Sequence, residues 1–275
     1  MNREIKLICS DIDGTLIKAD QTIGDITRKA VIRATECGIH FALATGRFKT
    51  GASSIEQKLG LPFDKLSGVY DNGAYVEANG KRVKAEGVRH SVILEISRLA
   101  KEYNARPVLF SGEEWIVEES DKWWAQINGF YEGRGVVDTF ENTLRKALAS
   151  SYQEPVKLVL RHDDPETITR LREDLNKRYP DLFFFLSHSD ILEVSMKHVD
   201  KGSGVKDLAD YFGITLDNIM AFGDFDNDIP MLKAVKYGVA MENGTKGAKE
   251  IASFYAPSNE DDGVGKMINK LLFEE

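Results

Sequence analysis

The stretch IKLICSDIDGTL (Ile5–Leu16) decides how this chain folds. Its first five residues, Ile5–Cys9, are apolar apart from one lysine. This apolar run predicts a buried strand, because it is too short to form a helix. Asp11 and Asp13 follow, and alternation along extended backbone predicts that both carboxylates point to one side. Gly14 then allows a sharp turn. Two carboxylates at the end of a buried strand repel each other and are costly to desolvate unless a divalent cation lies between them. The alternative interpretation is that one aspartate caps a helix and the other lies in a turn.

The pattern Asp-x-Asp-Gly-Thr-Leu after an N-terminal hydrophobic strand resembles the signature of the haloacid dehalogenase superfamily of phosphohydrolases. The resemblance implies that Asp11 is the nucleophile and that Asp13 is the general acid/base. The residue types suit this chemistry, because a carboxylate can form an aspartyl-phosphate and a second carboxyl can give and then take a proton. The dehalogenase branch is expected to lack the second aspartate, so Asp13 favours phosphate chemistry.

Composition is that of a soluble globular protein, with 275 residues, 42% hydrophobic and 29% charged. This length allows one large domain or two smaller ones. The net charge of -8 argues against nucleic acid or an anionic membrane as a partner. The longest apolar run, Leu182–Leu186, is far too short to span a bilayer, and the N-terminus shows no secretory signal. Cys9 and Cys37 lack metal-site spacing and are expected to be reduced, which predicts a cytoplasmic protein.

A helix near Ile26–Glu36 and a strand at His40–Ala44 complete a strand–helix–strand unit with two parallel strands. The second strand ends in Thr45-Gly46-Arg47, at the sheet edge where ligands bind in open parallel sheets. The Thr45 hydroxyl and the following backbone N–H of Gly46 can hold a phosphate oxygen there, the alternative being that Thr45 caps the next helix. By resemblance this is the family's second motif, and Thr-Gly-Arg is common in its sugar-phosphatase subgroup.

A separate α/β module is expected between about residues 82 and 188. It follows Asn72-Gly73-Ala74, a pattern that is typical of a hairpin turn. The subgroup often has Asn-Gly-Ala just before its inserted domain. All three tryptophans fall in this module, and we expect them in its core rather than in a substrate platform. The expected helices are Ser91–Tyr103, Asp121–Asn128, Asn142–Ser150 and Pro165–Arg178, and the expected strands are Arg106–Phe110, Trp115–Glu118, Val156–Arg161 and Leu182–Leu186.

The first pattern then returns with a strand at Ile191–Ser195 and a helix near Val205–Phe212. Lys201 lies at the start of this helix, where the helix dipole does not favour a positive charge. This position suggests a role other than a surface charge. It matches the family's third motif, a lysine that shields the nucleophile and the incoming phosphate.

A short buried strand, Ile219–Phe222, ends in Gly-Asp-Phe-Asp-Asn-Asp. Three acids in five residues need a counter-ion, and the pattern matches the family's fourth motif. The match implies that Asp224 binds the metal, that Asn227 binds phosphate and that Asp228 orients a lysine or a metal-bound water. Asp226 falls on a position that the family leaves free, so we expect it to be exposed.

The implied cofactor is Mg²⁺, which prefers oxygen ligands. Asp11, the backbone carbonyl of Asp13, and Asp224 are its expected protein ligands. The expected architecture is a Rossmann-like, doubly wound parallel sheet, formed by residues 1–82 and 189–275. An α/β cap of residues 83–188 is expected to select the substrate, as in the Cof-like subgroup with the type IIB cap.

The sequence therefore predicts a phosphatase that hydrolyses a small phosphorylated metabolite, with sugar phosphates as the subgroup's usual substrates. Three alternatives remain open: a phosphosugar mutase of the same superfamily, a response-regulator-like module, and a binding protein with a residual site. The complete motif set argues against the last, and the absence of membrane spans excludes a membrane ATPase of the superfamily. The sequence does not predict the oligomeric state.

Overall fold

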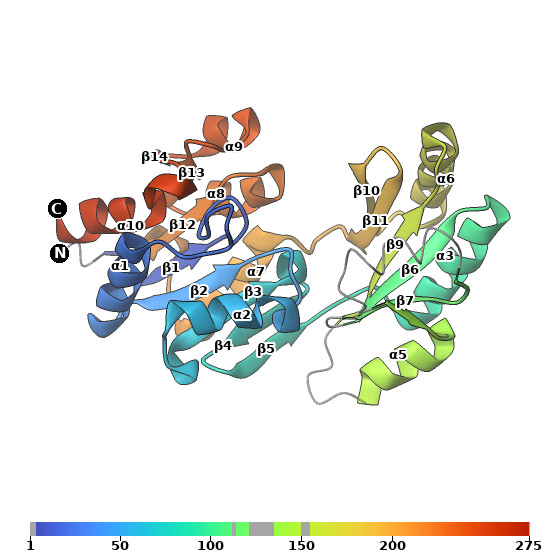
Figure 1. Ribbon diagram of the computed structural model, residues 1–275, viewed down its shortest axis with the longest axis horizontal. Coiled ribbons are helices and arrows are strands. Elements are labelled where there is room, and N and C mark those ends of the chain that lie inside the picture. The colour runs from blue at the N-terminus through green and yellow to red at the C-terminus, as the bar shows by residue number, and fades with distance from the viewer. Residues whose placement is uncertain (1–3, 112–113, 121–134, 150–154, 275) are drawn as a thin grey trace. The chain divides into compact units, whose positions relative to one another are not determined.

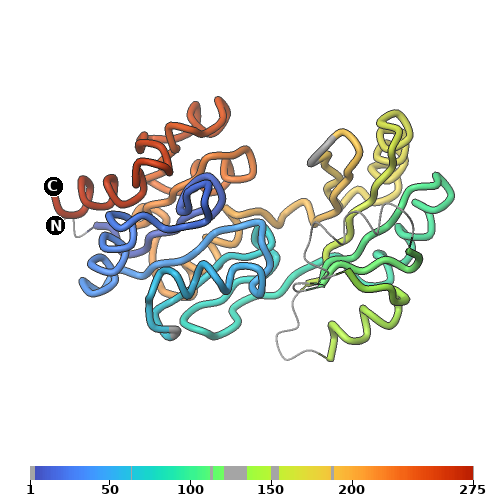
Figure 2. The backbone as a smooth tube through the Cα atoms, in the orientation of Figure 1, coloured from blue at the N-terminus to red at the C-terminus, as the bar shows by residue number. Residues whose placement is uncertain are grey.

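The computed structural model describes residues 4–111, 114–120, 135–149 and 155–274. The chain divides into two compact units, one of residues 1–84 and 199–275 and one of residues 85–198. Figure 2 shows the backbone leaving the first unit, which ends at residue 84, and returning to it, where it resumes at residue 199. The first boundary lies close to the expected residue 82, whereas the second lies at residue 198 rather than 188.

The first unit contains an eight-stranded sheet in the order β14-β13-β12-β1-β2-β3-β4-β5. The strands are β1 (Leu7–Ser10), β2 (His40–Ala44), β3 (Leu66–Tyr70), β4 (Tyr75–Ala78), β5 (Lys81–Ala85), β12 (Ile219–Gly223), β13 (Tyr237–Met241) and β14 (Phe254–Ala256). Neighbours from β14 through β3 pair in parallel, and β4 returns antiparallel to β3. Figure 1 shows β1 between β2 and β12, at the centre of the sheet.

Helices cover both faces of this sheet, so its central strands β1, β3, β12 and β13 are buried along their whole length. The helices are α1 (Asp25–Glu36), α2 (Lys49–Leu59), α7 (Lys201–Phe212), α8 (Ile229–Ala234), α9 (Lys246–Ile251) and α10 (Gly263–Ile268). Ile8 of β1 packs in the cluster that contains α1, α2 and α10, whereas Leu7 and Cys9 pack in the cluster that contains α7, α8 and α9. The doubly wound α/β core expected from the sequence is confirmed.

Register brings the ends of three strands together at one edge. Ser10, the last residue of β1, lies opposite Leu43 on β2 and opposite Phe222 on β12. The residues that follow these three positions, among them Asp11, Thr45 and Asp224, therefore leave the sheet at the same edge. Ligands of parallel α/β sheets bind at this carboxyl edge.

The second unit contains a six-stranded sheet in the order β10-β11-β9-β6-β7-β8, antiparallel except between β7 and β8. Its strands are β6 (Arg106–Ser111), β7 (Glu114–Val117), β8 (Gly135–Val137), β9 (Lys157–Arg161), β10 (Leu182–His188) and β11 (Ile191–Met196). Its helices α3 (His90–Glu102), α5 (Phe140–Ala149) and α6 (Pro165–Arg178) pack on a common apolar cluster with the sheet.

One strand was expected in the wrong unit. Ile191–Ser195 is predicted in the core from the sequence, but β11 pairs antiparallel with β10 and β9 in the second sheet. The short connection between β10 and β11 explains the error, because a strand that follows so closely on another forms a hairpin.

Expectations for the tryptophans are tested at one position. Trp115 is 3% exposed within β7, as expected for a core residue. The expected helix Asp121–Asn128, with Trp123 and Trp124, lies outside the described residues. None of the helices in the described part of the chain has both the length and the apolar composition needed to cross a bilayer.

Candidate active site

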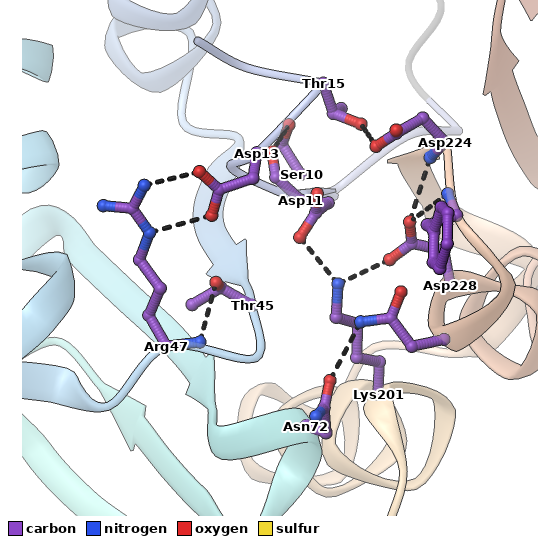
Figure 3. A network of polar contacts seen from close by, with 12 residues as sticks. Ser10, Asp11, Asp13, Thr15, Thr45, Arg47, Asn72, Lys201, Asp224 and Asp228 are labelled. Carbon is purple, nitrogen blue, oxygen red and sulfur yellow. Dashed lines mark hydrogen bonds and ion pairs between the residues drawn. The ribbon is translucent and has the colours of Figure 1, made fainter. Parts of the chain in front are cut away.

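The nucleophile expected from the sequence, Asp11, directly follows β1 and is only 6% exposed. Lys201, at the first position of α7, is 1% exposed. Its Nζ donates to Asp11 Oδ1 at 2.6 Å and to Asp228 Oδ1 at 2.6 Å, as Figure 3 shows. Three residues from strand ends and a helix start, far apart in the sequence, thus form one buried ion-pair network.

Asp228 is the anchor of this network and is fully buried. Its second oxygen, Oδ2, accepts from the backbone N–H groups of Asp224 and Phe225 at 2.9 and 3.0 Å. A Cβ on Gly223 would lie 2.5 Å from the Asp228 Cβ, so the close approach of this carboxylate requires glycine there. Asp228 therefore fixes both the turn after β12 and the position of Lys201.

Asp224 is held from the other side by the turn after Asp13. The Thr15 hydroxyl donates to Asp224 Oδ1 at 2.7 Å. Gly14 has φ of +76°, and a Cβ on it would lie 2.4 Å from Asp224 Oδ2. Glycine thus supplies both the left-handed backbone and the space that Asp224 needs.

These carboxylates fit a divalent cation. One oxygen from each of Asp11, Asp224 and Asp228 lies within 4.8 Å of the others. Three carboxylates against the single ammonium of Lys201 leave two uncompensated negative charges, which a divalent ion would neutralise. Carboxylate oxygens are the ligands that hard cations such as Mg²⁺ prefer.

The pKa values of these groups reflect the same excess of negative charge. Burial, with the nearby Asp228 and Asp224 charges, raises the pKa of Asp11 to about 8 against the opposing effect of Lys201. Burial and the Asp228 and Asp13 charges raise the pKa of Asp224 to about 6, although the Thr15 hydrogen bond lowers it. Burial opposes the charged form of Lys201, but Asp11 and Asp228 outweigh it and raise the Lys201 pKa.

Asp13 lies in a different network from Asp11. Its carboxylate receives Arg47 Nε at 2.8 Å and Arg47 Nη2 at 2.5 Å, and its side chain is 54% exposed. The expectation that both aspartates point to one side is wrong: Figure 3 shows Asp13 turned toward Arg47 and Asp11 toward Lys201. The reason is that β1 ends at Ser10, so the alternation of a strand does not extend through Asp13.

Thr45 is 1% exposed, and its hydroxyl accepts from the backbone N–H of Arg47 at 3.0 Å. The alternative that Thr45 caps the next helix is not observed, because the N-cap of α2 is Phe48. Gly46 passes close to Asn72, whose side chain would lie 3.3 Å from a Cβ on Gly46. Asn227 Nδ2 donates to Asn72 Oδ1 at 3.1 Å, so Asn72 joins two of the expected phosphate-binding segments.

Asp226 is exposed as expected, and it accepts from the Thr245 hydroxyl. Three residues of the network were not singled out from the sequence: Thr15, Arg47 and Asn72. Each lies within a recognisable motif or turn: Asp-Gly-Thr-Leu, Thr-Gly-Arg or Asn-Gly-Ala. Their position in the loops that follow β1, β2 and β3 is the signal that could have identified them.

Comparison with known proteins agrees with this geometry. The family model for haloacid dehalogenase-like hydrolases matches residues 8–268, almost the entire chain. The chain belongs to this family. A relative in Bacillus subtilis strain 168, the 5-amino-6-(5-phospho-D-ribitylamino)uracil phosphatase YitU, is 26% identical, with 96% of each chain covered.

Solved structures of haloacid dehalogenase-like hydrolases share the fold. The phosphatase BT1666 from Bacteroides thetaiotaomicron has a TM-score of 0.81 and 25% identity, covering 98% of this chain and 96% of its own. A subclass IIB sugar phosphatase, BT4131, has a TM-score of 0.73 and 21% identity, covering 96% and 98%. The resemblance to the Cof-like, subclass IIB phosphatases is confirmed, and the protein is an enzyme of the phosphatase type.

Proposed function

We propose that this haloacid dehalogenase-like hydrolase is a Mg²⁺-dependent phosphatase that hydrolyses small phosphomonoesters, sugar phosphates in particular, through an aspartyl-phosphate on Asp11. The observation that carries the proposal is the buried Asp11, with Lys201 on one oxygen and Asp224 and Asp228 carboxylates close by. A carboxylate in this setting can attack phosphorus while positive charge balances the incoming phosphate.

In the proposed first step, an oxygen of Asp11 attacks phosphorus and the bond from phosphorus to the leaving oxygen breaks. Asp13 gives its proton to that oxygen, which departs as an alcohol. In the second step Asp13 takes a proton from water as the water attacks the same phosphorus. The bond to Asp11 then breaks, and phosphate and the free carboxylate result.

The remaining motif residues are assigned to binding and positioning. Lys201 neutralises the transferring group and is itself oriented by Asp228. Thr45, the backbone of Gly46, and Asn227 would hold the phosphate oxygens. Asp11, Asp224 and the backbone carbonyl of Asp13 would hold Mg²⁺, with Asp228 behind them; when bound, the ion would stabilise negative charge on phosphate oxygens.

The substrate class rests on the relatives. YitU is named for a phosphoribityl compound and BT4131 for sugar phosphates, and both kinds of compound are phosphate esters of a polyhydroxylated carbon chain. We assign the choice of leaving group to the inserted unit, residues 85–198. Both cysteines are free, which supports a reducing, cytoplasmic location.

The test measures phosphate release from p-nitrophenyl phosphate, hexose phosphates and ribityl phosphates, with Mg²⁺ or with EDTA. We expect Mg²⁺-dependent release, phosphate on acid-quenched protein during turnover, and loss of both in Asp11→Asn. The matched control is Asp226→Asn, which removes an exposed carboxylate from the same site region. Transfer of phosphate between hexose hydroxyls without release would instead show a mutase, and turnover by Asp11→Asn near the wild-type rate would refute Asp11 as nucleophile.

A further inference from the structure

Arg47 makes the most specific contact in the site that the proposed function leaves without a role. Its guanidinium forms a two-point pair with Asp13, through Nε at 2.8 Å and Nη2 at 2.5 Å. Lys201, the other cation of the site, pairs instead with Asp11 and Asp228. Each catalytic carboxylate therefore has its own cation.

Hydrogen bonds of its backbone and of its guanidinium fix the position of Arg47. Its backbone N–H donates to the Thr45 hydroxyl at 3.0 Å, and its carbonyl accepts from the Asp71 N–H at 2.9 Å. Its Nη2 also donates to Gln21 Oε1 at 3.2 Å. Gln21 itself is a non-glycine residue with φ of 65°, and its carbonyl accepts from Lys58 Nζ at 2.8 Å. The guanidinium is thus anchored at the backbone and at its tip.

Asp13 needs such a partner because little else holds its side chain. It is 54% exposed, and among the described residues only Arg47 forms a hydrogen bond or ion pair with its carboxylate. An aspartate side chain at the surface otherwise samples several rotamers. The fork of an arginine fixes both carboxylate oxygens at once, which a lysine ammonium does not do.

We propose that Arg47 is a positioning residue that orients Asp13 for proton transfer to the leaving group and from water. The inference rests on the proposed function, in which Asp13 is the acid and base. It assigns to Arg47 neither contact with the substrate phosphate nor a share in cation binding. Substitution of Arg47 should therefore slow hydrolysis most for esters whose leaving group must be protonated.

Two esters of similar size separate these roles. Benzyl phosphate releases an alkoxide oxygen that must be protonated, whereas p-nitrophenyl phosphate releases a stable phenolate. General acid catalysis contributes about 10²–10⁴-fold where it is needed. For Arg47→Gln we expect kcat/KM to fall about 10- to 100-fold with benzyl phosphate and by a much smaller factor with p-nitrophenyl phosphate. Arg47→Lys should lie between wild type and Arg47→Gln, because it keeps the charge but loses the fork.

Two controls make the result specific. Arg28→Gln removes an arginine that is paired with Asp25 at the surface, and it should leave both esters at wild-type rates. In the Asp13→Asn background, Arg47→Gln should have no further effect with benzyl phosphate, because coupled residues are not additive. Inhibition by inorganic phosphate should be the same in wild type and Arg47→Gln.

Three results would overturn the inference. Equal losses with both esters, or weaker inhibition by phosphate, would mean that Arg47 binds the substrate. A full further loss in the Asp13→Asn background would mean that it does not act through Asp13. If wild type hydrolyses neither ester with Mg²⁺, the proposed function fails, and this outcome is distinct from the other two because it appears before any variant is made.

Discussion

Asp228→Asn tests the electrostatic design of the site most directly. Three donors converge on the two oxygens of Asp228: Lys201 Nζ, and the backbone N–H groups of Asp224 and Phe225. An amide offers one oxygen and one NH₂ group, so in either orientation the NH₂ group faces a donor. The substitution keeps the shape of the side chain and breaks its hydrogen bonding.

The cost can be worked from these contacts. Breaking a buried ion pair by removing one partner costs about 3–5 kcal/mol, and a buried donor left without an acceptor costs about 1–3 kcal/mol. Removing one of three clustered carboxylates relieves repulsion, since Asp228 raises the pKa of Asp11, and this offsets part of the loss. We expect a net destabilisation of about 3 kcal/mol without Mg²⁺, and more with it, because a bound cation has already cancelled that repulsion.

The assay is urea unfolding followed by circular dichroism, with tryptophan fluorescence as a second signal. All three tryptophans lie between residues 115 and 124, within the second unit, so fluorescence reports that unit and dichroism reports both. The control Asp226→Asn alters an exposed residue whose carboxylate accepts one hydrogen bond among the described residues, from the Thr245 hydroxyl, and should change stability by about 0.5 kcal/mol or less. If Asp228→Asn unfolds at the same urea concentration as Asp226→Asn, the network does not hold the core as argued.

Four further predictions concern the cation and the turn that follows Asp13. Affinity for Mg²⁺ should rise about tenfold per pH unit between pH 6 and 8, because the pKa of Asp11 is about 8 and Mg²⁺ must displace its proton. Equal dissociation constants for Mg²⁺ by calorimetry at pH 6.5 and 7.5 would contradict this. By the same raised pKa the cation-free fold binds more protons than the unfolded chain, so without Mg²⁺ its urea midpoint should fall as pH rises toward 8. Thr15→Val should raise the Mg²⁺ concentration needed for half-maximal activity about 3- to 10-fold, because Asp224 loses its hydrogen bond from the Thr15 hydroxyl. Turnover of p-nitrophenyl phosphate at saturating Mg²⁺ should change less. An unchanged Mg²⁺ titration would show that the hydroxyl is dispensable. Gly14→Ala should lose Mg²⁺-dependent activity and about 1–3 kcal/mol of stability, since φ is +76° and the new Cβ meets Asp224; normal activity would mean that the turn can adjust.

The sequence predicted the residues that meet at the sheet edge because strand order and register leave little choice. Buried parallel strands of four or five residues place their next residues at one edge, and Ser10 lies opposite Leu43 and Phe222 as a parallel register requires. The position of Lys201 at the start of α7 followed from a different argument. A lysine is unfavourable at a helix N-terminus, and its burial between two carboxylates provides the compensation.

The direction of individual side chains was not predictable in the same way. The alternation rule failed at Asp13 because the strand ends three residues earlier, so Asp13 does not lie on extended strand backbone. The pairing of Arg47 with Asp13 depends on how the chain turns after β2, which involves hydrogen bonds with residues 71 and 72. These contacts are long-range, so local sequence patterns carry little information about them.

A second buried network joins α2 to β3 and β4, next to the turn after β2. Lys49 Nζ, at the first position of α2, lies 2.9 Å from Glu56 Oε1, 3.0 Å from Glu77 Oε1 and 3.1 Å from the Tyr70 hydroxyl. The network links α2, β3 and β4 immediately beside the turns that carry Arg47 and Asn72. A buried ion pair is weak evidence for stability, because desolvation of its charges offsets most of the attraction. However, the two carboxylates, the ammonium and the phenol of this network favour a single arrangement, because any other arrangement leaves a buried charge unpaired. The geometry of the turn that presents Arg47 to Asp13 therefore depends on α2 being held in one register against β3, and we expect this network to matter more for catalysis than for the free energy of folding.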